Sequence, residues 1–153
     1  MAVRTAYDPV AGEVLTAVNL EKLAGGWIGY NEVTANQASI TTEVDLTNLT
    51  VAVTVGTGRR IRITSEVSIT GTVANDVGTL NIKEGATFIQ VRDVIVPIAS
   101  NAVLVASIVL TPTAGSHTYK LSAQRSAGTG TLTVTAGATR PAFIYVEDVG
   151  STP

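Results

Sequence analysis

From Trp27 onward the sequence is a succession of short segments in which apolar and polar residues alternate, separated by turns rich in glycine and asparagine. Leu49, Val51, Val53 and Val55, for example, alternate with threonine and alanine. A period of two places alternate side chains on opposite faces of a β-strand, so one face is buried and the other is exposed. No segment with the period of a helix separates these runs, and this excludes an arrangement of alternating strands and helices.

Alternation and turn residues predict about eight or nine strands, with turns every 8–12 residues or so. This pattern is typical of an antiparallel β-sandwich of the jelly-roll type, so the expected fold class is all-β. The expected strands cover residues 27–34, 49–55, a longer run with Ile61, Ile63, Val67 and Ile69, a short run with Leu80 and Ile82, residues 87–96, 102–110 and 117–124, a run with Leu132 and Val134, and residues 143–147.

The segment of residues 102–110 is apolar on both faces except at Ser107. Such a strand lies either in the middle of a sheet or at a surface that a neighbouring chain covers. Charged residues make up 14% of the chain, against about 25% in an ordinary soluble domain. Either neighbouring subunits cover much of the surface, or threonine supplies its polarity. The candidate residues for a subunit interface are Val103, Val105, Val109 and His117.

Gly25 and Gly26 divide the chain into an N-terminal arm, residues 1–26, and a β-sandwich domain, residues 27–153. The sequence predicts a small helix over residues 17–23, which Thr16 can cap and Gly25 can end. Ordering this arm costs more free energy, through lost conformational entropy, than burial of its apolar side chains can return. We therefore expect the arm to bind its own domain or a partner protein that also supplies hydrogen bonds. The predicted docking residues are Tyr7, Val10, Val14, Leu15, Leu20 and Leu23, and Trp27 and Tyr30 are predicted to join the arm to the domain.

The sequence lacks the sets of residues that catalysis or metal binding requires. It contains one histidine and no cysteine, so a histidine metal site would need His117 from three chains. Two acidic pairs, Glu43 with Asp45 and Glu147 with Asp148, lack the spacing of a calcium loop. The glycines mark turns and introduce no helix, so no phosphate-binding loop is indicated. We expect no enzymatic activity, no catalytic residue, no cofactor and no metal.

The sequence excludes nucleic acids and membranes as partners and leaves a host-surface glycan as an alternative. The net charge is −2, and the cluster Arg59, Arg60 and Arg62 would be split between two strand faces, so no nucleic-acid surface is expected. No apolar run reaches the roughly 18 residues of a membrane span. The N-terminus lacks the apolar core of a signal peptide, so we expect synthesis and folding in the cytoplasm. Glycan binding needs an exposed aromatic platform, whereas Trp27 is expected to anchor the arm.

The sequence also resembles a known class of proteins. Residues 9–20, PVAGEVLTAVNL, resemble a segment that opens many virion proteins of tailed bacteriophages. Residues 23–30, LAGGWIGY, resemble one group of small structural proteins from phages of actinobacteria. The same resemblance continues in residues 58–63, 83–85, 110–112, 117–121, 124–130 and 142–148 and so covers nearly the whole chain.

The resemblance implies a non-enzymatic virion component, often a homotrimer, with an N-terminal attachment segment and a β-sandwich displayed outward. Proteins of this kind are capsid decoration, head-fibre or minor tail proteins. A small chain without an extended shaft favours capsid decoration, with the chain itself and the major capsid or tail proteins as partners. The alternative is a tail-tip module that binds a receptor or a glycan of the host surface. In either case the protein is made in the bacterial host cytoplasm and located in the virion.

Overall fold

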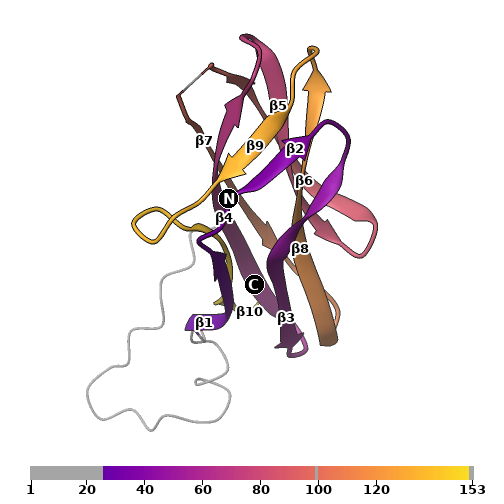
Figure 1. The fold of residues 1–153 in the computed structure, drawn as a ribbon. Helices are drawn as coiled ribbons and strands as arrows, with labels where there is room; N and C mark the ends of the chain where they lie inside the picture. The colour runs from indigo at the N-terminus through magenta and orange to yellow at the C-terminus, as the bar shows by residue number, and fades with distance from the viewer. Residues whose placement is uncertain (1–25, 99, 152–153) are drawn as a thin grey trace, which may run out of the picture.

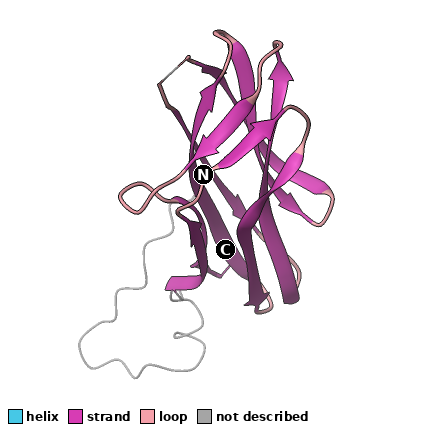
Figure 2. Cartoon of the chain, viewed as in Figure 1, coloured by secondary structure: helices cyan, strands magenta, loops and turns pink. Residues whose placement is uncertain are grey.

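The computed structural model describes residues 26–98 and 100–151, which form two β-sheets packed face to face (Figures 1 and 2). All ten strands within these residues are joined by turns and loops, without a helix. They are β1 (Gly26–Val33), β2 (Gln37–Ile40), β3 (Val44–Val55), β4 (Arg59–Gly71), β5 (Asp76–Glu84), β6 (Thr87–Val96), β7 (Ala102–Leu110), β8 (Gly115–Ala127), β9 (Leu132–Thr135) and β10 (Ala142–Ser151).

The larger sheet has six strands in the order β1-β10-β4-β9-β2, with β7 also paired to β4. Strands β10 and β7 both pair with the first half of β4, so they lie on opposite sides of it, and β7 is an edge strand. The smaller sheet has the order β3-β8-β5-β6. Every pairing between these strands is antiparallel. The prediction of an all-β, jelly-roll-like antiparallel sandwich is therefore confirmed.

Most predicted strands lie where alternation placed them, and β6 and β7 have the predicted bounds. The structure adds β2, which pattern reading missed because only its last residue, Ile40, is buried. Ser39 has a φ of 63°, and β2 meets β9 only at Gln37 and Ile40. Such a short, irregular strand carries no period of two. The helix predicted within the arm lies outside the described residues.

The core consists of the alternate apolar residues of both sheets, including the predicted set on β3 and β4. Gly29 of β1 faces this core. A Cβ atom at Gly29 would lie 2.3 Å from Val51 Cγ1 and 2.7 Å from Val53 Cγ1. Only glycine therefore lets β1 lie this close to β3 across the interior.

Asp76 begins β5 and is 1% exposed. Its carboxylate accepts hydrogen bonds from the backbone N–H groups of Thr129, at 3.0 Å, and Gly130, at 2.9 Å. It therefore holds the turn between β8 and β9. Gly128 in that turn has a φ of 100° and leaves no room for a Cβ atom beside the carboxylate.

Candidate interaction surface

Four aromatic side chains gather on the outer face of the larger sheet, on the neighbouring strands β1 and β10. We call Trp27, Tyr30, Phe143 and Tyr145 the aromatic cluster. Trp27 stacks on Tyr145 with ring centroids 5.2 Å apart and on Tyr30 at 5.6 Å. Phe143 stacks on Tyr145 at 6.1 Å and on Tyr30 at 6.4 Å. Trp27 is 67% exposed and Tyr30 is 46% exposed, so the cluster faces solvent.

The alternation of β10 positions these rings. Its residues Ala142, Ile144 and Val146 are buried in the core, which turns Phe143 and Tyr145 outward. Tyr30 lies directly opposite Tyr145 in the pairing of β1 with β10. Cross-strand aromatic neighbours of this kind stabilise a sheet by packing against one another.

Charged side chains surround the aromatic cluster. The Tyr30 hydroxyl donates a hydrogen bond to the Glu32 carboxylate, and this bond, together with partial burial, raises the pKa of Tyr30. Arg62 of β4 forms an ion pair with Glu147 of β10 at 2.9 Å. The predicted splitting of the arginine cluster is visible here, because Arg62 lies on this outer face while Ile61 beside it is buried. Glu32 and Glu66 form no salt bridge with any residue in the described ranges.

Strand β7 contributes a second apolar feature on the same face. Its residues Val103, Val105 and Val109, which we call the valine row, are 49%, 54% and 46% exposed. Their neighbours Leu104 and Ala106 are buried in the core. Because β7 is an edge strand, the explanation of this segment as a central strand is wrong. The remaining explanation, cover by a neighbouring chain, stays a prediction.

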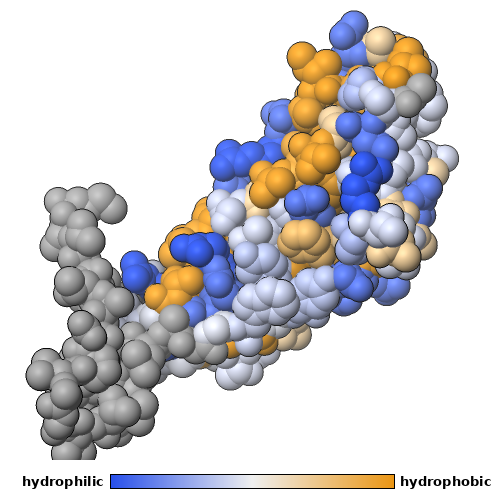
Figure 3. All heavy atoms as spheres, turned by 90° about the vertical axis from the view of Figure 1, so that its left-hand side faces the viewer, coloured by the Kyte–Doolittle hydropathy of each residue, from blue (hydrophilic) through white to orange (hydrophobic). Residues whose placement is uncertain are grey.

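Figure 3 views the sandwich from the side on which β1, β4 and β7 lie in Figure 1. Hydrophobic residues form several separate patches along the length of this surface, with hydrophilic residues between them. Further exposed apolar side chains lie on β6, on the outer face of the smaller sheet, and just after it: Phe88, Val91, Ile95 and Ile98. Single exposed apolar residues are ordinary, but repeated ones along neighbouring edge strands indicate an interaction surface.

On the outer face of the smaller sheet, beside the exposed apolar residues of β6, the charged groups on and next to the other strands bind one another. Lys83, whose side chain is 8% exposed, pairs with Glu43 at 2.6 Å and with Asp45 at 3.3 Å, and Lys120 also pairs with Asp45. The Lys83 ammonium holds the pKa of Glu43 below its usual value, and the Lys120 ammonium does the same for the pKa of Asp45. Glu43 and Asp45 are therefore members of an ion-pair network.

His117, a predicted interface residue, is turned inward at the start of β8, with its side chain 11% exposed. Its Nδ1 lies 2.7 Å from Glu84 Oε1, and its Nε2 lies 2.8 Å from the carbonyl oxygen of Thr113. Since both partners accept, both ring nitrogens donate, and these bonds raise the pKa of His117. The geometry of His117 gives no support to its predicted place at an interface.

Tyr119 lies behind His117 in the core. It is fully buried, and its hydroxyl has no hydrogen-bond partner among the described residues. Burial, assisted by the nearby charge of Glu84, raises the pKa of Tyr119 to about 12. The His117 and Tyr119 rings are stacked with centroids 6.0 Å apart. The hydrogen bonds of His117 join the start of β8 to the end of β5 and to the loop before β8, and we call this arrangement the His117 latch.

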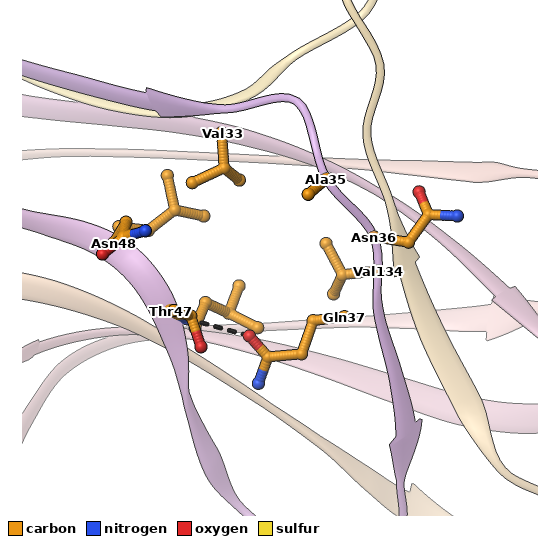
Figure 4. A pocket seen from close by; sticks show the side chains of 9 residues that line it. Val33, Ala35, Asn36, Gln37, Thr47, Asn48 and Val134 are labelled. Carbon is orange, nitrogen blue, oxygen red and sulfur yellow. Dashed lines mark hydrogen bonds between the residues drawn. The ribbon is translucent and has the colours of Figure 1, made fainter.

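A pocket of about 210 Å³ opens between β2 and β3, where Val33, Leu46, Leu49 and Val134 form an apolar floor (Figure 4). Gln37 spans its wall: its side-chain amide donates to Asp45 O at 3.2 Å, and its side-chain oxygen accepts from Thr47 N at 2.8 Å. The pocket lining contains no charged side chain. It offers a small apolar hollow and no acid–base chemistry.

Residues 26–98 and 100–151 contain no group of three or more histidine, aspartate or glutamate side chains arranged to hold a metal ion. Nor does this part of the chain form a helix long and apolar enough to span a bilayer. Of the predicted site residues, Trp27, Tyr30 and the valine row lie on one sheet face. The predicted arm residues lie outside the described residues: Tyr7, Val10, Val14, Leu15, Leu20 and Leu23. Phe143 and Tyr145 were not predicted as site residues, although their alternation with Ala142, Ile144 and Val146 is visible in the sequence.

No protein-family model and no curated protein sequence matches this chain. Among solved structures, the Eiger TNF of S. frugiperda is similar with a TM-score of 0.53 and 10% identity, covering 84% of this chain and 96% of that one. Murine APRIL is similar with a TM-score of 0.54 and 8% identity, covering 81% of this chain and 99% of the APRIL chain. A chain of infectious bursal disease virus aligns with a TM-score of 0.47 and 15% identity, covering 99% of this chain and 47% of its own length. At these identities the first two similarities establish the fold, a jelly-roll-like β-sandwich, as the chain's structural class.

Proposed function

We propose that this chain is a structural protein of a tailed-phage virion, attached through residues 1–26, that displays its β-sandwich on the particle surface as a capsid decoration or stabilising protein. The observation that carries the proposal is the exposed apolar surface of the larger sheet, made of the aromatic cluster and the valine row. On the smaller sheet the charged groups around Lys83 are paired with one another, and exposed apolar side chains lie along its edge strand β6.

This surface supports a protein whose larger sheet is covered in the assembly. Burial of a half-exposed valine or a larger aromatic side chain stabilises an assembly by about 1 kcal/mol each. The paired ions of the smaller sheet face need no partner. The sequence resemblance to virion proteins indicates a phage particle as the location. Self-association as a homotrimer would bury the exposed apolar side chains. The role requires neither catalysis nor a cofactor.

The number of copies per particle tests the location. Quantitative mass spectrometry of purified virions should find hundreds of copies if the protein decorates the capsid lattice. A count between three and about a dozen, as the symmetry of a tail would impose, would instead assign it to the tail.

Deletion of residues 1–24 tests the attachment. The truncated protein should remain folded, because the described core begins with β1, but it should be absent from assembled particles. Circular dichroism checks the fold and immunoblotting of purified virions checks incorporation. Normal incorporation of the truncated protein would refute attachment through the arm.

A tail-tip module that binds a host-surface glycan is the second candidate, because Trp27 is 67% exposed and lies directly opposite an acidic residue, Glu147. Sugars stack on open ring faces, but Tyr145 lies stacked between Trp27 and Phe143. This stacking favours protein contact. Quenching or shifting of Trp27 fluorescence by host cell-wall polysaccharide, at unchanged oligomeric state, would support the glycan candidate instead.

A further inference from the structure

The aromatic cluster and the valine row occupy opposite sides of one sheet face. The register of the strands places Trp27, Glu147, Arg62 and Val109 in one row across β1, β10, β4 and β7. The two apolar groups are therefore separated by β4, whose outward residues are Arg62, Thr64 and Glu66. With neighbouring strands about 4.8 Å apart, β10 and β7 lie about 10 Å from each other. Both groups point the same way, so they cannot cover each other within one copy.

We propose that the aromatic cluster of one copy docks on the valine row of a second copy. This inference rests on the proposed self-association and specifies which surfaces meet. Branched aliphatic side chains at an edge strand and a cluster of stacked rings offer each other apolar cover that neither finds within its own copy.

The charges at the two rims favour this unlike pairing. Glu32, on β1 beyond the aromatic cluster, is exposed. Arg92, on β6 beyond the valine row, is exposed and forms no salt bridge with any residue in the described part of the chain. It follows Gln90 by two residues, and the Gln90 amide donates to the Ser107 carbonyl of β7 at 3.0 Å, so this side of β6 borders the valine row. Docking cluster on row brings Glu32 toward Arg92, whereas docking cluster on cluster would bring two Glu32 carboxylates together.

When the aromatic cluster of one copy binds the valine row of another, the first copy still has a free valine row and the second a free aromatic cluster. Such contacts are completed when the copies close into a ring, or when two copies contact each other reciprocally. Closure with three copies is the arrangement that agrees with the proposed homotrimer.

Two surface variants and their mixture test the pairing. Trp27→Thr removes the most exposed ring of the aromatic cluster and keeps a residue that suits a strand. Val109→Asp interrupts the valine row and places its carboxylate beside Arg62, where the fold tolerates it. Val73→Asp, at a valine 40% exposed in the β4–β5 turn, is the matched control. Thermal unfolding of each purified full-length variant checks that it is folded.

Analytical ultracentrifugation, at a concentration at which the wild-type protein is assembled, gives the mass of each sample. We expect Trp27→Thr and Val109→Asp to be monomers and Val73→Asp to match the wild type. An equimolar mixture of the two monomeric variants should contain a species of about twice the monomer mass, because one intact cluster meets one intact row. Dissociation of only one variant, or a mixture that stays monomeric, would overturn the pairing. A monomeric wild-type protein would overturn it as well, while the virion role stands or falls separately on copy number and arm deletion.

Discussion

At the scale of single residues, the side chains that hold the sandwich together include polar ones far apart in the sequence. Arg59 pairs with Asp148 at 2.5 Å, and both side chains are largely buried. Asp76 binds the turn that follows β8, more than fifty positions later. These contacts fasten loops and strand ends to the core, and each can be removed by one substitution.

Asp76→Ala leaves the backbone N–H groups of Thr129 and Gly130 without their buried acceptor. We expect the free energy of unfolding to fall by about 2 kcal/mol, the usual cost of leaving buried donors unsatisfied. Urea unfolding followed by circular dichroism measures the change. Glu66→Gln, at a half-exposed carboxylate, is the control and should change stability by less than about 0.5 kcal/mol. Equal stability of the two variants would contradict the role of Asp76.

His117 makes stability depend on pH. The Glu84 carboxylate and then the Thr113 carbonyl raise the pKa of His117 above its usual 6.5. A raised pKa in the folded state means that the contribution is fully present below the unfolded pKa and is lost as pH rises through the folded pKa. Wild-type stability should therefore decline above pH 6.5 more than that of His117→Gln. Parallel pH profiles of urea midpoints for the two proteins would count against the latch.

At the scale of elements, the sequence predicts which segments form strands better than it predicts which strands lie next to each other. Alternation predicted β3, β4, β6, β7 and β8, because a period of two is a local property that survives in any sandwich. The predicted set on β3, from Leu49 to Val55, is buried. The position of β7 at an edge could not be read, because an apolar strand suits the middle of a sheet as well as a covered surface. Strand β2 was missed because it buries one residue.

The close approach of β1 to β3 depends on Gly29. Gly29→Val would place atoms within the van der Waals shells of Val51 and Val53, and we expect a loss of about 1–3 kcal/mol of unfolding free energy. Thermal denaturation should show the corresponding fall in melting temperature. Gly137→Ala is the matched control, because a Cβ atom there meets nothing within 4 Å. A melting temperature of Gly29→Val equal to that of the control would mean that β1 does not pack on β3 in solution.

At the scale of the whole molecule, the outer faces of the two sheets differ in the side chains that they expose. The larger sheet exposes rings and valines, and the smaller sheet combines an ion-pair network with exposed apolar side chains along its edge strand β6. The single tryptophan of the chain, Trp27, lies on the outer face of the larger sheet and reports on its environment without any label. An assembly that covers the aromatic cluster must transfer this indole from water to an apolar contact.

We therefore expect the fluorescence maximum of Trp27 to move to shorter wavelength as protein concentration rises through the assembly range. Val109→Asp should keep the long-wavelength emission of an exposed tryptophan at all these concentrations, and Val73→Asp should follow the wild type. A wild-type spectrum independent of concentration, in a sample shown by ultracentrifugation to assemble, would place the aromatic cluster outside the interface.

An all-β sandwich, and the side chains that share each strand face, could be predicted from the sequence, since both follow from local alternation and turn residues. The sequence also marked Val103, Val105 and Val109 as candidates for a covered surface. The edge position of β7, the pairing of β1 with β10, and the gathering of four rings from β1 and β10 into one cluster became visible in the folded chain. Strand order depends on contacts between distant segments, and no local pattern records the energies of those contacts.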